Sequence, residues 1–379
     1  MKEDKIKIGA VGDIFLCRNI QRICETEGYD YPFRQVVEKL RSYDILFGNL
    51  ENPVSNRGIA AKQNPHVTFQ AGIESVSGIK QAGFNIVSLA NNHMNDYGEV
   101  AFIDTLSILK ANGIFYVGAG EDEKQARNHV VFEKNNTRIA FLAYHHLFGK
   151  TIRAAKKNKS GIATLVRNQC LKDIRKAKSE SDILCVSVHW GLDYYHYPSP
   201  YYIELSRKFI EAGCDVVLGH HSHVLQGYDS HNGGLIFYGL GNFIFDDPNP
   251  DTQLSVILDI TISDRKIKNY RFIPVFDDGS HQIRFAEGDL KRKILEKIAI
   301  LSAEYQKNHW KGRFYKDPTD NLIWKSCKSI INGGSLHHFR NFPVMLVLKR
   351  TLPLSIFKIK QHFIRKKQLK FYEEDTACN

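Results

Sequence analysis

The sequence has no apolar stretch at its start that is long enough for a signal peptide or a membrane anchor, because residues 1–7 are polar. Its seven cysteines are odd in number, irregularly spaced and without a CxxC pair. This usage indicates reduced thiols and argues against a disulfide framework or a structural zinc knuckle. No internal repeat is evident either. We therefore expect a globular protein in the cytoplasm, or held at the inner face of the membrane.

Excess positive charge is nearly absent from the first three quarters of the chain. Residues 286–379 carry 19 Lys and Arg against 9 Asp and Glu, which accounts for +10 of the whole net charge of +11. This asymmetry predicts two units, residues 1–285 and a basic, mainly helical region of residues 286–379. Basic and apolar residues alternate near the end of that region. It is expected to contact an anionic membrane surface, a membrane synthase or an acidic polymer, or else to pack as a solvated helix. Nucleic acid is not expected, since no nucleic-acid fold signature accompanies the charge.

Apolar runs and helical patterns alternate along the chain, as they do in α/β proteins with parallel βαβ units. Helical spacing recurs in four segments, several of which end at glycine. A hairpin is predicted near residues 253–275 and is expected to close a second sheet. The predicted strands are residues 5–11, 45–47, 86–89, 138–144, 183–188, 216–218 and 235–238, and the predicted helices are 73–82, 100–111, 169–177 and 202–212.

Five short polar motifs follow apolar runs: Gly12-Asp13, Gly48-Asn49-Leu50-Glu51, Asn91-Asn92-His93, His189-Trp190-Gly191 and His220-His221-Ser222-His223. Ligands of open α/β sheets bind in the crevice at the carboxyl ends of the strands, so these motifs are expected to converge. Their oxygen and nitrogen donors suit one or two divalent transition metals, and the imidazoles favour Mn, Fe or Zn over Mg.

Each motif by itself has a structural interpretation. Asp13 can cap a turn, Asn92 can be an ordinary turn residue, and a single histidine such as His189 can be structural. The last motif is more specific, because His221 and His223 would point to the same side of an extended backbone and reach neighbouring coordination positions. All five motifs together favour a metal site.

The motif order, with Gly241-Asn242-Phe243 after it, resembles the CapA/PgsA family of capsule and poly-γ-glutamate biosynthesis proteins, over roughly residues 5–275. That family belongs to the calcineurin-like metallophosphoesterases. The resemblance implies a four-layer α/β/β/α sandwich with metals at the strand ends. It also implies that His93 contacts the scissile phosphate. The positions matching metal ligands are Asp13, Glu51 (or Asn49), Asn92, His189, His221 and His223.

Two positions depart from the wider superfamily. Phe15 stands where the Asp-x-His motif has its histidine, and Asn49 replaces the aspartate of the Gly-Asp motif. Glu51, two residues further, would lie on the same side of an extended segment and supply the missing charge. Two hypotheses follow: a metal-dependent hydrolase, and a non-catalytic scaffold that binds polymer or a synthase partner.

The hydrolase hypothesis assigns roles to three more residues. Two cations about 3.5 to 4 Å apart would activate a water to attack phosphorus, in a phosphoester or an anionic polymer intermediate. His93 would donate a proton to the leaving oxygen. Asp96 either orients His93 or caps the helix that begins near Gly98. Arg18 either binds an anionic substrate group or is a plain surface residue.

Overall fold

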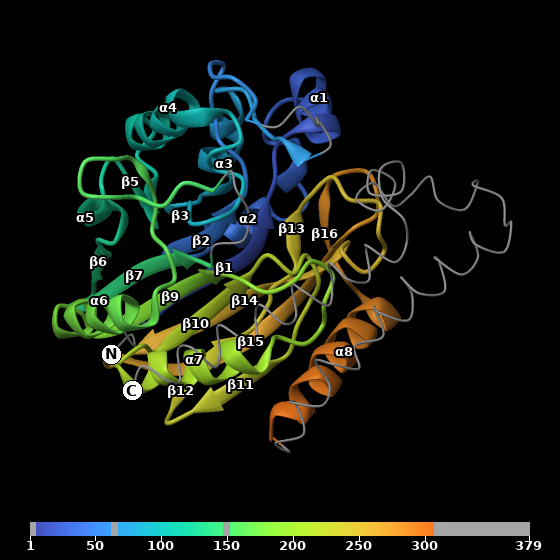
Figure 1. Ribbon diagram of the computed structural model, residues 1–379. Helices are drawn as coiled ribbons and strands as arrows, with labels where there is room; N and C mark the ends of the chain where they lie inside the picture. Colours follow the sequence, from blue (N-terminus) through green and yellow to red (C-terminus); the bar gives the residue numbers. More distant parts are fainter. Residues whose placement is uncertain (1–4, 62–66, 147–151, 307–379) are drawn as a thin grey trace, which may run out of the picture.

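Two β-sheets lie face to face at the centre of the computed structural model, and helices cover both outer faces (Figure 1). The structure describes residues 5–61, 67–146 and 152–306. Three apolar clusters separate the layers: one lies between the sheets, and one lies under the helices on each side. The predicted four-layer α/β/β/α sandwich is confirmed.

The first sheet has the strand order β16-β15-β14-β1-β2-β3-β4, and β13 also pairs with β1. Strands β1 to β4 run parallel to one another. Its strands are β1 (Ile6–Ile14), β2 (Ile45–Leu50), β3 (Ile86–Ser88), β4 (Phe115–Val117), β13 (Asn242–Ile244), β14 (Leu254–Ser263), β15 (Lys266–Asp277) and β16 (Ile283–Phe285).

The hairpin of β14 and β15 is present, but the expectation that it closes the second sheet is wrong. Strand β14 pairs antiparallel with β1, in a register that sets Ile6 opposite Ile262 and Ile8 opposite Ile260. These side chains are buried in the same apolar cluster between the sheets. The hairpin therefore covers what would otherwise be an open edge of β1, a strand with eight of its nine residues buried.

The second sheet has the order β11-β12-β10-β9-β7-β6, with its four inner strands parallel and β6 and β11 antiparallel at the edges. Its strands are β6 (Val130–Lys134), β7 (Thr137–His145), β9 (Ile183–His189), β10 (Val216–His220), β11 (Tyr228–His231) and β12 (Gly234–Phe237). A small separate pair is formed by β5 (Ala119–Gly120) and β8 (Gly161–Ile162).

The helices bury one apolar face each against the nearer sheet. On the first sheet, α4 places Phe102 and Leu106 in the outer cluster, and α3 ends at Gly83, whose left-handed φ of 96° suits glycine. The helices are α1 (Arg18–Glu27), α2 (Val37–Arg41), α3 (Ser75–Ala82) and α4 (Gly98–Ala111) on the first sheet, with the short 3-10 helix Tyr31–Phe33, and α5 (Glu123–Ala126), α6 (Arg167–Ser179) and α7 (Pro200–Glu211) on the second.

The basic region, predicted to be mainly helical, begins with α8 (Gly288–Gln306), which lies along one side of the molecule (Figure 1). It buries Ile294 and Ile298 in the cluster between the sheets, and the Tyr305 ring lies 4.7 Å from that of Tyr238. The described part of the basic region is thus packed on the core. The remaining residues, 307–379, with the predicted membrane-binding segment, lie outside the described residues, and the boundary at 285 stays a prediction. Among the helices that the structure describes, none is long and apolar enough to cross a bilayer.

Candidate metal centre

The predicted polar motifs meet at the carboxyl ends of the parallel strands. Asp13 and Asn49 face one another in register near the ends of β1 and β2, and His189 and His220 do the same at the ends of β9 and β10. Because the two sheets pack face to face, residues from both reach one buried place. The structure brings the predicted ligand residues together there, as hydrogen bonds and ion-pair contacts among them show: Asp13, Asn49, Glu51, Asn92, His189, His221 and His223.

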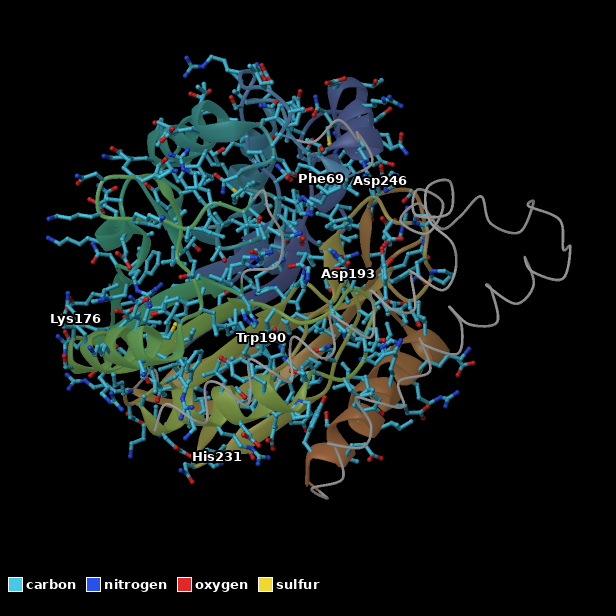
Figure 2. The ribbon with its side chains drawn as sticks, viewed as in Figure 1. Phe69, Lys176, Trp190, Asp193, His231 and Asp246 are labelled. Atoms are coloured by element: carbon cyan, nitrogen blue, oxygen red, sulfur yellow. The ribbon has the colours of Figure 1, made fainter. Side chains whose placement is uncertain are left out.

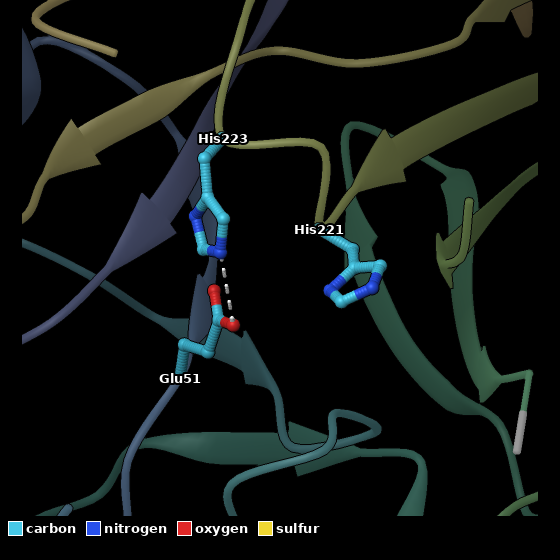
Figure 3. A group of neighbouring side chains, drawn as sticks. All are labelled: Glu51, His221 and His223. Carbon is cyan, nitrogen blue, oxygen red and sulfur yellow. Dashed lines mark ion pairs between the residues drawn. The ribbon is translucent and has the colours of Figure 1, made fainter. Parts of the chain in front are cut away.

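Glu51 is shared by the two groups of side chains that best fit a metal ion among the described residues. One group is Glu51, His221 and His223, and the other is Asp13, Glu51 and His189, each with its donor atoms within 4.8 Å of one another. Figure 3 shows the first group, with the Nε2 atom of His223 3.9 Å from Oε1 of Glu51. The same oxygen lies 3.5 Å from Nε2 of His189. Glu51 therefore occupies the place that a bridging carboxylate needs.

The Glu51 carboxylate is fully buried, and neither of its oxygens has a hydrogen-bond partner within the described part of the chain. Burial, and then the charge of Asp13, raise its pKa well above the usual value. A buried carboxylate without donors is strongly destabilising unless a positive charge compensates it. The residues present therefore fit a divalent cation, which would satisfy these oxygens.

Asp13 is held by neighbours on several sides. Its Oδ1 lies 3.2 Å from Nδ1 of His220 and accepts a hydrogen bond from Nδ2 of Asn49 at 2.9 Å. Its Oδ2 accepts from the backbone N–H of His221 at 3.2 Å. Burial alone would raise the pKa of Asp13, but His220 and then His223 outweigh it, and the pKa is lowered. Asp13 is thus kept ionised, as a metal ligand must be.

Asn49 connects ligands instead of presenting its oxygen to the centre. Its Nδ2 donates to Asp13 and lies 3.3 Å from Nδ1 of His189. Its Oδ1 accepts a hydrogen bond from Asn91 at 3.4 Å. Of the two residues offered for the bridging position, Glu51 has the matching geometry, and Asn49 orients the side chains around it.

His189 and Asn92 form the side of the centre nearest to β9. The Nε2 atom of His189 lies 2.7 Å from Oδ1 of Asn92. Burial, and then the neighbouring His221 and His145, lower the pKa of His189 well below its usual value. The ring is therefore neutral near pH 7, which is the form that binds metals.

The backbone at His221 and His223 is not extended as predicted, because both residues have left-handed φ angles, of 87° and 59°. The chain turns sharply after β10, and the backbone N–H of His221 binds Asp13 within this turn. Such backbone strain in non-glycine residues is concentrated at functional sites. The Oδ1 atom of Asn242 lies 2.9 Å from Nδ1 of His223, which leaves Nε2 directed to Glu51. The turn, not a strand periodicity, brings the two rings to one site.

His93 lies beside the predicted ligands and is oriented by Asp96. Its Nδ1 is 2.7 Å from Oδ2 of Asp96, and its Nε2 is 3.9 Å from Oε1 of Glu51. The alternative that Asp96 caps the following helix is wrong, since Tyr97 is the N-cap residue of α4 and has no capping side chain. Asp96 also accepts a hydrogen bond from the backbone N–H of Phe69 at 3.0 Å. It thus connects His93 to a neighbouring loop.

Arg18 begins α1, and its guanidinium lies 4.5 Å from the centre of the Phe69 ring and 5.6 Å from that of Phe15. Phe15 is fully buried and stacks on Phe245 at 4.4 Å, so an aromatic side chain fills the place of the missing histidine. The ring centre of Phe69 lies 4.3 Å from that of His93, and the ring centre of Phe245 lies 4.7 Å from that of His223. Arg18 therefore lies against an aromatic wall beside the candidate site. Figure 2 labels Phe69, which belongs to this wall, and Asp246. Both lie on the opposite side of the molecule from Lys176 and His231.

Two site neighbours were not predicted from the sequence. Asp193 has Oδ1 3.5 Å from Nε2 of His221, and it lies in a loop without periodicity that gives no signal. His145 is the last residue of β7, and its ring centre lies 5.3 Å from that of His189. A signal existed for His145, since it follows the apolar run 138–144 in the way that His189 follows its own run.

Comparison with known proteins identifies similar sequences. The family profile described as "Bacterial capsule synthesis protein PGA_cap" matches residues 7–247. The capsule biosynthesis protein CapA of Bacillus anthracis is 36% identical over 269 residues, which cover 69% of this chain and 65% of that protein. The PGA biosynthesis protein CapA of Bacillus subtilis is 32% identical over 77% of either chain. A phosphatase structure from Mycoplasma pneumoniae is 13% identical, with a TM-score of 0.48, over 73% of this chain and 96% of the phosphatase.

Proposed function

The chain belongs to the bacterial capsule synthesis protein family, and from this premise we propose that it is a metal-dependent hydrolase acting in the synthesis of a capsule or poly-γ-glutamate type polymer. The matched segment, residues 7–247, contains all the predicted ligand residues. The proposed substrate is a phosphoester intermediate or the anionic polymer itself. A membrane surface or a membrane synthase remains the proposed partner of the basic region.

The observation that carries this proposal is the buried carboxylate of Glu51, which lies among three imidazoles and Asp13 and has no hydrogen-bond partner within the described residues. Two carboxyl groups and three imidazoles suit Mn, Fe or Zn. Asp13, Glu51 and the histidines at 189, 221 and 223 would hold one or two ions, and Asn92 adds an amide oxygen beside His189. Bound there, such ions supply Lewis acidity and an activated water.

His93 is placed to move a proton. Asp96 holds its Nδ1, so that Nε2 is the nitrogen on the side of Glu51. With Nδ1 held by this carboxylate, Nε2 is the nitrogen that would donate a proton to a leaving oxygen. Asp96 acts as the positioning residue for this donor, because it touches the ring and is itself fixed by the backbone of Phe69.

The aromatic wall and Arg18 give the centre an anion-binding side. Phe15, Phe69 and Phe245 exclude water next to His93 and His223. A guanidinium next to such a wall binds a phosphate or carboxylate with two parallel hydrogen bonds. We assign Arg18 to an anionic group of the substrate.

The second candidate function, a non-catalytic scaffold, is favoured by Phe15. Its stacked ring leaves the Asp13 side of the centre without the imidazole that the Asp-x-His motif supplies. A scaffold would retain the metal and bind polymer or a synthase at the same site, without hydrolysis.

A substrate screen separates the two functions. The full-length protein, loaded with Mn²⁺, Fe²⁺ or Zn²⁺, should hydrolyse at least one class of phosphoester. The variant His93→Ala should lower kcat about 10²-fold or more while the metal content stays at the wild-type value, as expected for a general acid. His231→Ala is the control, because His231 pairs with Glu211 on the surface, far from the centre. A metal-loaded protein that hydrolyses none of the substrates, or a His93→Ala variant of unchanged rate, would favour the scaffold.

A further inference from the structure

Three neighbouring strands of the second sheet end in histidine at the same level. His145 of β7 is in register with His189 of β9, which is in register with His220 of β10. Phe141 and Ala143, four and two residues before His145, point into the apolar cluster between the sheets. Since side chains alternate along a strand, His145 faces the same inner side, where the candidate metal centre lies.

The hydrogen bond of His145 determines which ring nitrogen carries the proton. Its Nδ1 lies 3.0 Å from the backbone carbonyl oxygen of His189, which can only accept, so Nδ1 carries the proton and donates. In the neutral ring, Nε2 then has a free lone pair. Nε2 is buried, and it has no hydrogen-bond partner within residues 5–61, 67–146 and 152–306. An N–H donated to a backbone carbonyl, with the other nitrogen left as an acceptor, is the usual arrangement of a metal-binding histidine.

The ring spacing agrees with a shared ion. The ring centre of His145 lies 5.3 Å from that of His189 and 6.5 Å from that of His221, and the latter two are 4.6 Å apart. With a metal–nitrogen bond of about 2.1 Å, imidazoles on one ion have ring centres roughly 4.5 to 6.5 Å apart, depending on the angle between them. All three spacings lie within this range.

We propose that His145 is a further metal ligand, which offers Nε2 to the ion held on the side of His189 and Asn92. This inference rests on the metal centre of the proposed function. His145 is not part of the two groups of three whose donor atoms lie within 4.8 Å of one another, so it would be an additional and more distant ligand of the centre. A ligand set richer in nitrogen on this side favours Zn or Fe over Mg.

A purely structural role is the competing explanation, in which the Nδ1 hydrogen bond only ties the ends of β7 and β9 together. Two substitutions separate these roles, because each retains only one of the two polar groups of the imidazole. In His145→Asn the amide N–H replaces Nδ1–H and Nε2 is lost. In His145→Gln the amide oxygen reaches the place of Nε2 and the bond to the carbonyl of His189 is lost.

The experiment is calorimetric titration of the metal-stripped, full-length protein with Zn²⁺, followed by the visible spectrum of the Co²⁺ form. We expect His145→Asn to weaken metal affinity about 10- to 100-fold and to change the Co²⁺ spectrum, while His145→Gln stays close to wild type. His146→Asn is the matched control, because the adjacent ring lies against Tyr202 of α7. Its affinity should equal that of the wild type.

The opposite pattern, with His145→Asn unchanged and His145→Gln impaired, would show a structural residue and overturn the inference, while leaving the metal centre intact. A wild type that binds no Zn²⁺ would remove both the centre and this ligand. Should His145→Asn fail to fold, a crystal structure of the Zn²⁺-loaded wild type decides, with Nε2 at about 2.1 Å from the ion if His145 is a ligand. A clearly longer distance would contradict the inference.

Discussion

The variant Glu51→Gln should be more stable than wild type without metal and less stable than wild type with metal. Glu51 is fully buried next to Asp13, and burial raises its pKa well above the usual value. The folded state therefore holds this proton more tightly than the unfolded state does. Stability from the protonated group is complete below about pH 4.5 and is lost as the pH rises through the folded-state pKa. Near neutral pH, Glu51→Gln removes this loss of stability, because the amide of glutamine does not ionise.

The direction of the effect without metal and the size of the effect with metal both follow from the site. Because burial raises the pKa of Glu51, the metal-free variant should be more stable than wild type near neutral pH. With free metal at 100 times Kd, the wild type should gain about 2.7 kcal/mol. The variant lacks the shared carboxylate and should lose most of this gain. At roughly 2 to 4 °C per kcal/mol for a domain of 150 to 250 residues, the differences are several degrees in Tm.

Thermal melts at pH 7.5, with chelator and with Mn²⁺ or Zn²⁺, measure this directly. The variant should melt above wild type in chelator and below it in metal. Glu74→Gln, at an exposed position, is the control and should change neither temperature. If Glu51→Gln kept the whole metal-induced increase, the shared position of Glu51 would be refuted, and a variant less stable than wild type in chelator would refute the burial argument.

Two further predictions concern other parts of the chain. The Nδ1 atom of His281 lies 3.5 Å from Oδ2 of Asp277, and its Nε2 atom lies 3.7 Å from Oδ1 of Asp246. The contact with Asp277 raises the pKa of His281. The ion pair therefore stabilises the folded state below about pH 6.5, and this stabilisation is lost as the pH rises through the raised pKa. His281→Gln should therefore lower Tm more at pH 5.5 than at pH 8.5, and equal losses would contradict the assignment. Residues 307–379 carry 15 Lys and Arg against 5 Asp and Glu, and at about 1 kcal/mol per basic residue near the surface they should bind anionic vesicles in a salt-sensitive way. Truncation after Gln306, which keeps the buried Ile294 and Ile298 of α8, should abolish sedimentation with such vesicles, and an equal pelleted fraction would exclude the membrane partner.

The layered fold and the location of the site could be predicted from the sequence, because both depend on local patterns. Apolar runs such as residues 183–188 form buried strands, and alternation of strands with helices implies parallel pairing. Polar residues that follow these runs must lie at the carboxyl edge of the sheet. This argument predicted that His189 and Asn92, 97 residues apart in the chain, lie at the same site, where the structure has Nε2 of His189 2.7 Å from Oδ1 of Asn92.

The division of roles within the site was decided only by the tertiary structure. Asn49 and Glu51 are equivalent in a strand pattern, but the register of β1 against β2 sets Asn49 beside Asp13 and leaves the Glu51 carboxylate between both ligand groups. The place of the hairpin of β14 and β15 was also decided by the tertiary structure. Its apolar alternation is compatible with either sheet, and the pairing of β14 with β1 assigns it to the first sheet.

The physical reason why the sequence alone could not assign these roles is seen at three histidines, His221, His223 and His145. The first two reach Glu51 through left-handed backbone angles, which a turn stabilised by Asp13 imposes and no side-chain periodicity encodes. His145 faces the centre because β7 pairs with β9 in a register that sets it opposite His189. Local composition determines which residues lie at a strand end, whereas strand register and the packing of the two sheets determine which of their atoms come within bonding distance.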